Sequence, residues 1–161
     1  MIHPTADIEE GATVHPTAKV WHYAHIRKGA HIGENTIIAR GVFVDKNVHV
    51  GKNCKVQNYA CLYHGTIIED GVFIGPRVIT TNDKHPRSIN EDGSIKTDDD
   101  WQCGQVVVGE GASLGAGVIV LPDVIIAPGT MVGAGAVVSK STTEGIYVGV
   151  PAINYVEGLP S

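Results

Sequence analysis

An aliphatic residue recurs at every sixth position along most of this chain. An α-helix repeats every 3.6 residues and a β-strand every two, so neither explains a period of six. A fixed six-residue period is typical of a solenoid in which very short strands alternate with tight turns. Two runs carry the period: Ile8, Val14, Val20, Ile26, Ile32, Ile38, Val44, Val50, Val56, Leu62, Ile68 and Ile74, and then Val108, Leu114, Val120, Ile126, Val132 and Val138.

The other positions of the six-residue unit fit the same interpretation. A small or branched residue stands four positions after each aliphatic residue, as at Ala18, Ala24 and Thr36. A coil with a narrow interior needs one large and one small residue on each side, so we expect both columns to face inward. Glycine often follows the aliphatic residue directly, as at Gly33 and Gly51. We expect these glycines to supply backbone conformations that corners require.

The repeat is interrupted once, and the interruption divides the chain. Between the two runs the six-residue phase is lost, and Thr81–Gln105 leave the coil. An excursion of this length is usually functional or disordered. Its first part places an amide, a carboxylate and two cations between Asn82 and Arg87, which favours a functional loop over a solvated protrusion. We predict one domain over residues 1–161, with coils at 8–80 and 106–143, an extruded loop at 81–105 and a C-terminal extension at 144–161.

Composition excludes several classes of protein. The net charge of −5 argues against a nucleic-acid surface. No apolar run reaches transmembrane length, and no charged-then-apolar leader precedes the repeat, so we expect no membrane partner. The three cysteines form neither a disulfide framework nor a metal-binding spacing, which favours a reducing cytoplasm.

The repeat pattern, written [LIV]-[GAED]-x-x-[STAV]-x, resembles that of the hexapeptide-repeat acyltransferases. Members of that family fold as left-handed parallel β-helices, in which three six-residue units make one triangular coil of 18 residues. The resemblance therefore implies an all-β fold, a left-handed parallel β-helix with one long extruded loop. The handedness comes from the resemblance alone, because the general rule for parallel crossovers predicts the opposite hand.

Four segments resemble a narrower group, the N-acetyltransferases that act on 3-amino sugars attached to nucleotides. The best match is to those that acetylate UDP-2-acetamido-3-amino-2,3-dideoxy-glucuronic acid. These enzymes are cytoplasmic homotrimers that use acetyl-CoA to build surface polysaccharide precursors. Their active sites lie between adjacent subunits at the base of the extruded loop. The segments that carry the resemblance are Val20–Ile26, Lys55–Gly65, Phe73–Pro76 and Thr81–Arg87.

Carried over to this sequence, the resemblance implies two catalytic candidates. Asn82 corresponds to a residue near the reacting amine, and an amide oxygen can accept a hydrogen bond from that amine. His64 stands where the family more often has Asp or Glu after an aromatic residue. Histidine is a good general base near neutral pH, so the proton-accepting role can persist with a different group.

The resemblance also implies contacts with the acceptor sugar nucleotide. Lys84 and Arg87 are expected to pair with its diphosphate or with a sugar carboxylate. An aromatic ring at Trp21 or Tyr23 can stack on a base or on pantetheine, although packing at a coil corner explains the same residues. The predicted substrate-binding set is Asp83, Lys84, Arg87, Trp21, His22 and Tyr63.

For the donor, the resemblance places pantetheine against backbone groups of the late coils. Small residues there let a ligand approach the main chain. Relatives often carry a cation soon after the Pro-Ala that corresponds to Pro151 and Ala152, but here none follows Lys140. The predicted acetyl-CoA-binding set is Gly115, Ala116, Gly117, Ala134, Gly135, Lys140 and Pro151.

The eight histidines raise the question of a metal. His31 and His49 are 18 residues apart, so in such a helix their rings stack on one side, about 4.8 Å apart. Trimeric γ-class carbonic anhydrases share this helix, but their signature includes two histidines five residues apart, and no pair here has that spacing. A His22/His25 pair is also poor evidence for zinc. We therefore expect no metal.

Other functions fit the same pattern. Within the enzyme class, the alternatives are acetylation of a dTDP-linked 3-amino-3,6-dideoxyhexose and O-acetylation of a sugar. Outside it, the chain would be a non-catalytic scaffold or a pseudo-carbonic-anhydrase subunit. A scaffold has no need for the polar residues Asn82, Lys84 and Arg87.

Overall fold

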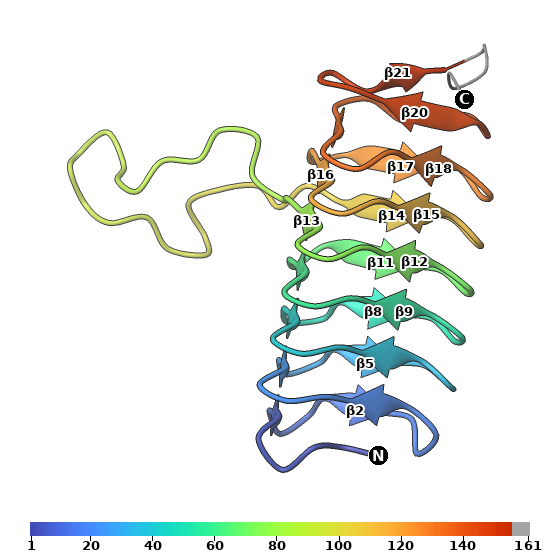
Figure 1. The fold of residues 1–161 in the computed structure, drawn as a ribbon. Coiled ribbons are helices and arrows are strands. Elements are labelled where there is room, and N and C mark those ends of the chain that lie inside the picture. The colour runs from blue at the N-terminus through green and yellow to red at the C-terminus, as the bar shows by residue number, and fades with distance from the viewer. Residues whose placement is uncertain (156–161) are drawn as a thin grey trace.

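The computed structural model describes residues 1–155, which form a stack of triangular coils (Figure 1). Each coil contributes one short strand to each of three sheets, and the result is a left-handed parallel β-helix. The seven-stranded sheet contains β1 (Asp7–Ile8), β4 (His25–Ile26), β7 (Phe43–Val44), β10 (Cys61–Leu62), β13 (Ile79–Thr80), β16 (Ile119–Val120) and β19 (Val137–Val138).

The other two sheets complete the triangle. The six-stranded sheet contains β2 (Thr13–Val14), β5 (His31–Ile32), β8 (His49–Val50), β11 (Thr66–Ile68), β14 (Val106–Val108) and β17 (Val124–Ile126). The eight-stranded sheet contains β3 (Lys19–Val20), β6 (Ile37–Ile38), β9 (Lys55–Val56), β12 (Phe73–Ile74), β15 (Ser113–Leu114), β18 (Met131–Val132), β20 (Ile146–Val148) and β21 (Ile153–Asn154). Residues 1–155 contain no helix able to span a membrane.

The register between coils is constant except across the loop and where β20 joins β18. Ile26 pairs with Val44, which is 18 residues further along, and Val44 pairs with Leu62 in the same way. Across the extruded loop Thr80 instead pairs with Val120, so the loop is inserted without disturbing the stack. All strand pairs are parallel except β20 with β21.

The predicted inward columns form the core. Every aliphatic residue of the period from Val20 to Ile74 is 0% exposed, and those from Val108 to Val138 are at most 1% exposed. Ile8 and Val14 are partly buried because they pack against the core from the open N-terminal end. The register predicted from the six-residue period is therefore confirmed.

The glycines that directly follow an aliphatic residue have a different role from the expected one. Gly33 has no positive φ, and a Cβ atom there would lie 2.5 Å from the Gly51 backbone. The left-handed backbone conformation lies three positions after the aliphatic residue of a unit, as at Asn35 (φ 55°) after Ile32 and at Gly41 (φ 66°) after Ile38. Gly33 thus serves the close approach of successive coils, and the expectation of a special corner conformation at Gly33 and Gly51 was wrong.

Two edges of the triangular stack position the functional residues. The turns that follow strands of the seven-stranded sheet form what we call the loop edge, which carries Arg27, Asp45 and His64 and from which the extruded loop projects (Figure 1). The turns that follow strands β3 to β18 of the eight-stranded sheet form the glycine edge, which carries Trp21 and Gly115.

The predicted C-terminal extension at 144–161 continues the eight-stranded sheet. Strand β20 pairs with β18, and β21 folds back antiparallel onto β20. Its last six residues, 156–161, lie outside the described part of the chain.

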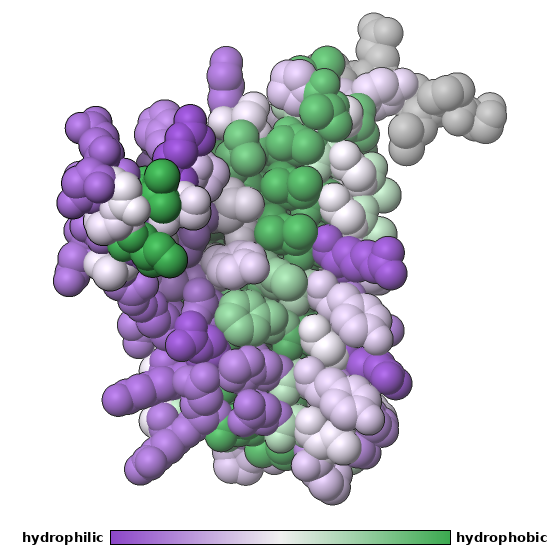
Figure 2. All heavy atoms as spheres, turned by 90° about the vertical axis from the view of Figure 1, so that its left-hand side faces the viewer, coloured by the Kyte–Doolittle hydropathy of each residue, from purple (hydrophilic) through white to green (hydrophobic). Residues whose placement is uncertain are grey.

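Apolar side chains form a band along the outer face of the seven-stranded sheet, next to the base of the loop (Figure 2). These side chains stack on one another in successive coils down the sheet, and each is half-buried. The band consists of Phe43, Cys61, Ile79, Ile119 and Val137.

Candidate functional site

His64 and Asn82 lie on adjacent coils of the loop edge, one directly above the other. His64 is in the turn between β10 and β11, and Asn82 follows β13 where the extruded loop begins. The Asn82 side-chain amide donates a hydrogen bond to the His64 carbonyl oxygen (3.1 Å). The structure therefore brings the two predicted catalytic residues together.

The hydrogen bond of the His64 ring fixes its tautomer. Nδ1 lies 2.8 Å from the backbone oxygen of Lys46. A carbonyl oxygen only accepts hydrogen bonds, so Nδ1 carries the proton in the neutral ring. Nε2 then bears the lone pair, which is the arrangement that a general base requires.

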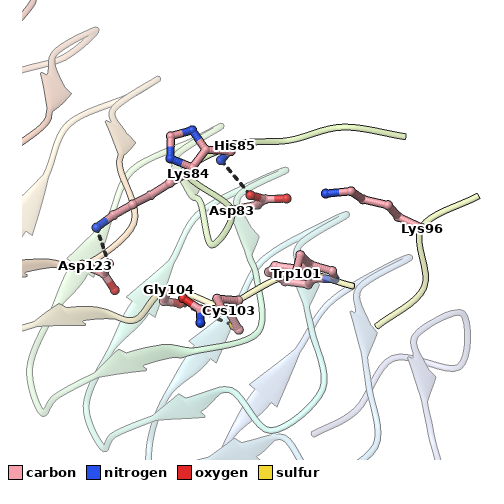
Figure 3. A pocket seen from close by; sticks show the side chains of 9 residues that line it. Asp83, Lys84, His85, Lys96, Trp101, Cys103, Gly104 and Asp123 are labelled. Carbon is pink, nitrogen blue, oxygen red and sulfur yellow. Dashed lines mark hydrogen bonds and ion pairs between the residues drawn. The ribbon is translucent and has the colours of Figure 1, made fainter. Parts of the chain in front are cut away.

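A cavity of about 490 Å³ lies under the extruded loop (Figure 3). Asp83, Lys84 and His85 from the outgoing arm of the loop line it, together with Lys96 and Trp101 from the returning arm. Sequence reasoning assigned no site role to Lys96 or Trp101. We refer to this cavity as the loop pocket.

Lys84 forms an ion pair with a neighbouring coil. Its Nζ atom lies 2.6 Å from Oδ2 of Asp123, a residue of the next coil. The hydrogen bond from Lys84 and a second from the Gln105 backbone lower the pKa of the Asp123 carboxyl group. An anionic ligand would therefore compete with Asp123 for Lys84, whereas Lys96 makes no ion pair within residues 1–155.

Asp83 lies where three hollows meet. Besides the loop pocket, it lines a hollow of about 440 Å³ against Leu121 and a hollow of about 220 Å³ that also contains Tyr63 and Asn82. The predicted residues Tyr63, Asn82 and Asp83 therefore share one surface. Arg87 lines none of these hollows, and its guanidinium group donates to the Pro86 carbonyl oxygen (3.0 Å).

Trp21 and His22 lie on the glycine edge, away from Asn82 in the same chain. They line a hollow of about 310 Å³ with Arg40 and Asn58. The His22 ring stacks on His3, with ring centroids 3.5 Å apart. Burial, and then the neighbouring His3, lower the pKa of His22, so this ring stays neutral over a wider range of pH.

The predicted donor-site residues also lie mainly on the glycine edge, in the late coils. The backbone N–H groups of Gly115 and Gly133 bond to the following coil, at 2.8 Å in each case. Those of Ala116 and Ala134 make no hydrogen bond within residues 1–155, and both residues are exposed. Ala116 and Ala134 therefore offer free donors to a ligand that runs along this edge.

Two of the predicted donor-site residues lie elsewhere. Lys140 is an exposed residue of the loop edge, and Pro151 is in the turn between β20 and β21. Within one chain, the structure thus separates the catalytic candidates on the loop edge from most of the donor candidates on the glycine edge.

The remaining observations concern the stacked histidines, possible metal ligands and the cysteine beside His64. The rings of His31 and His49 stack as predicted, 4.9 Å apart and 5° from parallel. No three metal-ligating side chains converge anywhere in residues 1–155. The Cys103 thiol donates to the His64 carbonyl oxygen (3.3 Å), and burial raises its pKa, which disfavours the reactive thiolate.

Several solved structures share this fold. PerB from Caulobacter crescentus, in complex with CoA and GDP-perosamine, is 24% identical with a TM-score of 0.66, over 96% of this chain and 56% of that one. A variant of this perosamine N-acetyltransferase, bound to the same ligands, is 25% identical with a TM-score of 0.53, over 97% and 56% of the chains. The present chain thus spans little more than half the length of that enzyme.

Two further proteins are similar over more of their own length. AntD, an N-acyltransferase from Bacillus cereus in complex with dTDP-4-amino-4,6-dideoxyglucose and coenzyme A, is 21% identical with a TM-score of 0.58, over 96% of this chain and 81% of that one. A maltose O-acetyltransferase from Clostridium difficile 630 is 24% identical with a TM-score of 0.64, over 81% and 71% of the chains. No curated protein matches the sequence.

The model of one protein family matches the repeats themselves. It is described as bacterial transferase hexapeptide (six repeats), and it matches residues 11–46, 47–82 and 105–140. The gap in the match coincides with the extruded loop, and the matched residues make up about two thirds of the chain. The chain therefore belongs to the bacterial transferase hexapeptide family.

Proposed function

We propose that this protein is an acetyl-CoA-dependent N-acetyltransferase that acetylates the 3-amino group of a nucleotide-linked amino sugar. The observation that carries the proposal is the hydrogen bond from Asn82 to the His64 backbone, made where Asn82 lines a hollow at the base of the loop. The likeness to a perosamine N-acetyltransferase bound to CoA and a nucleotide sugar supports the same class of reaction.

The proposed reaction is direct transfer. The amine nitrogen attacks the thioester carbonyl carbon, the C–S bond breaks, and the product is an amide and the thiolate of CoA. Nε2 of His64 takes the proton that the amine loses and returns it to the thiolate. Asn82 holds the amine in line for attack, and a free backbone N–H on the glycine edge, at Ala116 or Ala134, stabilises the tetrahedral oxyanion.

The proposed acceptor is UDP-2-acetamido-3-amino-2,3-dideoxy-glucuronic acid. Its amine belongs beside Asn82, and its anionic groups belong in the loop pocket, where Lys96 makes no direct ion pair within residues 1–155. The product would be consumed by glycosyl transfer in the assembly of a surface polysaccharide.

An assay with a panel of acceptors tests this function. The protein is incubated with acetyl-CoA and the UDP-linked uronic acid, a dTDP-linked 3-amino-3,6-dideoxyhexose, or the matching 3-hydroxy sugars, and release of CoA thiol and the product mass are measured. We expect acetylation of the amino sugars, fastest with the uronic acid. Transfer only to the 3-hydroxy sugars would identify an O-acetyltransferase, and no transfer to any acceptor would favour a scaffold.

A further inference from the structure

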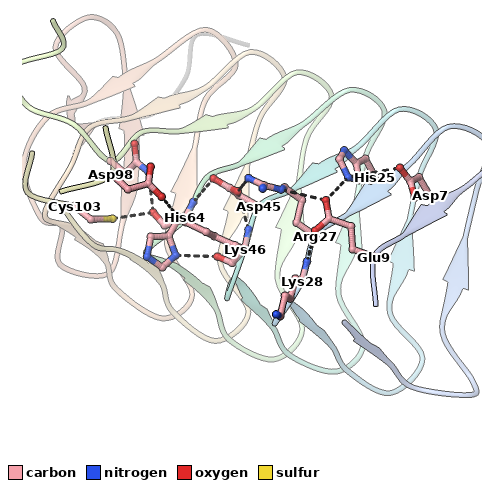
Figure 4. A network of polar contacts seen from close by, with 11 residues as sticks. Asp7, Glu9, His25, Arg27, Lys28, Asp45, Lys46, His64, Asp98 and Cys103 are labelled. Atoms are coloured by element: carbon pink, nitrogen blue, oxygen red, sulfur yellow. Dashed lines mark hydrogen bonds and ion pairs between the residues drawn. The ribbon is translucent and has the colours of Figure 1, made fainter. Parts of the chain in front are cut away.

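Asp45 is a buried carboxylate directly beneath the catalytic candidates on the loop edge. The residue is 8% exposed. Its oxygens accept hydrogen bonds from Arg27 Nη1 (2.8 Å), the Lys46 backbone N–H (2.7 Å) and the His64 backbone N–H (3.1 Å) (Figure 4). A buried charge is costly unless such partners satisfy it, so the position of this carboxylate is tightly specified.

Two routes connect Asp45 to the His64 ring. The first is direct, because Oδ2 of Asp45 accepts from the His64 backbone N–H. The second passes through Lys46, whose N–H is held by Oδ1 of Asp45 and whose carbonyl oxygen accepts from Nδ1 of His64 (2.8 Å). The carboxylate thus fixes both the backbone of His64 and the acceptor that sets its tautomer.

Charged side chains of the coils on the N-terminal side of Asp45 form ion pairs that connect to it. Arg27 bridges Asp45 and Glu9, with its Nε atom 3.3 Å from Oε1 of Glu9. The hydrogen bonds to Asp45 and Glu9 raise the pKa of the Arg27 guanidinium group, so it stays charged. Glu9 in turn accepts from the Lys28 N–H (2.8 Å) and contacts His25 (2.9 Å). A ladder of charges therefore runs up the loop edge and ends at His64.

Asp45 is one of several carboxylates that bind a backbone N–H of an adjacent coil, and a comparison with Asp70 shows what is particular to it. Asp70 accepts from the Lys52 N–H (2.9 Å) at a third edge of the stack, which carries none of the candidate catalytic residues. Asp45 differs because its second oxygen binds the residue that bears the free Nε2 atom. Asp70 is therefore a matched control.

We propose that Asp45, held by Arg27, is a positioning residue that keeps His64 in the tautomer with a proton on Nδ1 and a lone pair on Nε2. The proposal rests on the proposed function, in which Nε2 takes the proton of the amine. It adds to that function a residue that touches neither substrate.

Two measurements on the Asp45→Asn variant test this role. Side-chain nitrogen NMR of His64 reports its tautomer without any substrate, and steady-state kinetics report the reaction. In the unmodified protein we expect the neutral ring to be protonated at Nδ1. In Asp45→Asn we expect a mixture of tautomers and a kcat at least about tenfold lower, part of the 10²–10⁴-fold that a general base contributes. The KM for acetyl-CoA should change by less than about twofold, because Asp45 is proposed to contact neither substrate.

A double-mutant cycle separates positioning from a general structural effect. Because Asp45 is proposed to act through His64, Asp45→Asn should lower kcat no further in a His64→Ala background. An equal loss in both backgrounds, or an unchanged tautomer in Asp45→Asn, would overturn the proposal. Asp70→Asn should leave both the tautomer and kcat unchanged.

If Asp45→Asn does not fold, the Arg27→Gln variant provides a second test of the same role. It removes the charged partner of Asp45 and should shift the His64 tautomer in the same direction by a smaller amount, and no shift would count against the proposal. If no acceptor is acetylated, the proposed function fails, and the NMR result still decides whether Asp45 controls the His64 ring.

Discussion

Asn82 lines the hollow of about 220 Å³ at the base of the loop, and its backbone anchors the loop. Its side-chain amide nitrogen donates to the His64 carbonyl oxygen, so its amide oxygen is the atom that can accept a hydrogen bond from an amine. Its backbone oxygen accepts from the Gly104 N–H (2.7 Å), which closes the base of the loop. A change limited to the side chain should therefore affect the chemistry without opening the loop.

Asn82→Ala should lower kcat by at least about tenfold, because an amine that is no longer held in line attacks less often. The dissociation constant for acetyl-CoA should stay within about twofold, since the donor candidates lie on another edge. Steady-state kinetics and calorimetric binding of CoA measure the two effects. Comparable losses of kcat and CoA affinity would contradict a role confined to the amine.

Single strands of this fold are stabilised by side chains that point inward from all three sheets. Ile68 of β11 is 0% exposed, whereas Ile125 of β17 lies in the same sheet but points outward and is 55% exposed. We expect Ile68→Ala to lower the free energy of unfolding by about 2–5 kcal/mol, the usual cost of such a core truncation. Ile125→Ala should cost less than about 1 kcal/mol. Denaturant unfolding of both variants compares them, and equal costs would mean that the inward register is wrong.

The extruded loop is tethered to the loop edge by an ion pair between Lys46 and Asp98. The hydrogen bond from Lys46 lowers the pKa of the Asp98 carboxyl group, so the folded state holds this proton less tightly than the unfolded chain does. The tether is therefore fully present above the ordinary range for Asp, near pH 4, and is lost as the pH falls through the lowered value.

Asp98→Asn should release the returning arm of the loop at neutral pH. Amide hydrogen exchange in residues 88–100 should rise by about two- to fivefold, as expected for loss of one exposed ion pair. Asp99→Asn is the control, because Asp99 makes no ion pair within residues 1–155. In the unmodified protein the same rise should occur only under acid conditions. Equal exchange in the two variants would show that the tether does not hold the loop.

At the scale of the whole molecule, the proposed reaction uses residues of two edges that one chain keeps apart. The catalytic candidates lie on the loop edge, and most of the donor candidates lie on the glycine edge. The apolar band beside the loop offers a surface for a neighbouring subunit (Figure 2), and a site that uses both kinds of edge needs the glycine edge of such a neighbour. We therefore predict a homotrimer, as the family resemblance implies.

Sedimentation should give a mass three times that of the chain. In mixed trimers, Asn82→Ala and Ala134→Trp subunits should together recover activity that neither has alone, because some shared sites then contain both intact residues. A stable monomer at micromolar concentration, or no recovery on mixing, would contradict a site between subunits.

The sequence by itself determined the coil, its core and its register. A six-residue period places one aliphatic side chain on each side of every coil. With the three units per coil that the family resemblance implies, burial of that column aligns Ile26 with Val44 and each coil with the next. The stacking of His31 on His49 follows from the same 18-residue spacing, and so does the contact of Asn82 with His64. These neighbours were predictable because a regular solenoid converts distance along the chain directly into position.

Only the tertiary structure decided which residues complete the site. Lys96 and Trp101 return to the base of the loop, and Lys84 meets Asp123, but the phase of the repeat is lost between Thr80 and Val106, so no spacing predicts these contacts. The role of Asp45 was hidden for a different reason. The spacing placed it beneath the Tyr63–His64 turn, but its three donors depend on where each backbone N–H points, which is fixed only when the coils are stacked.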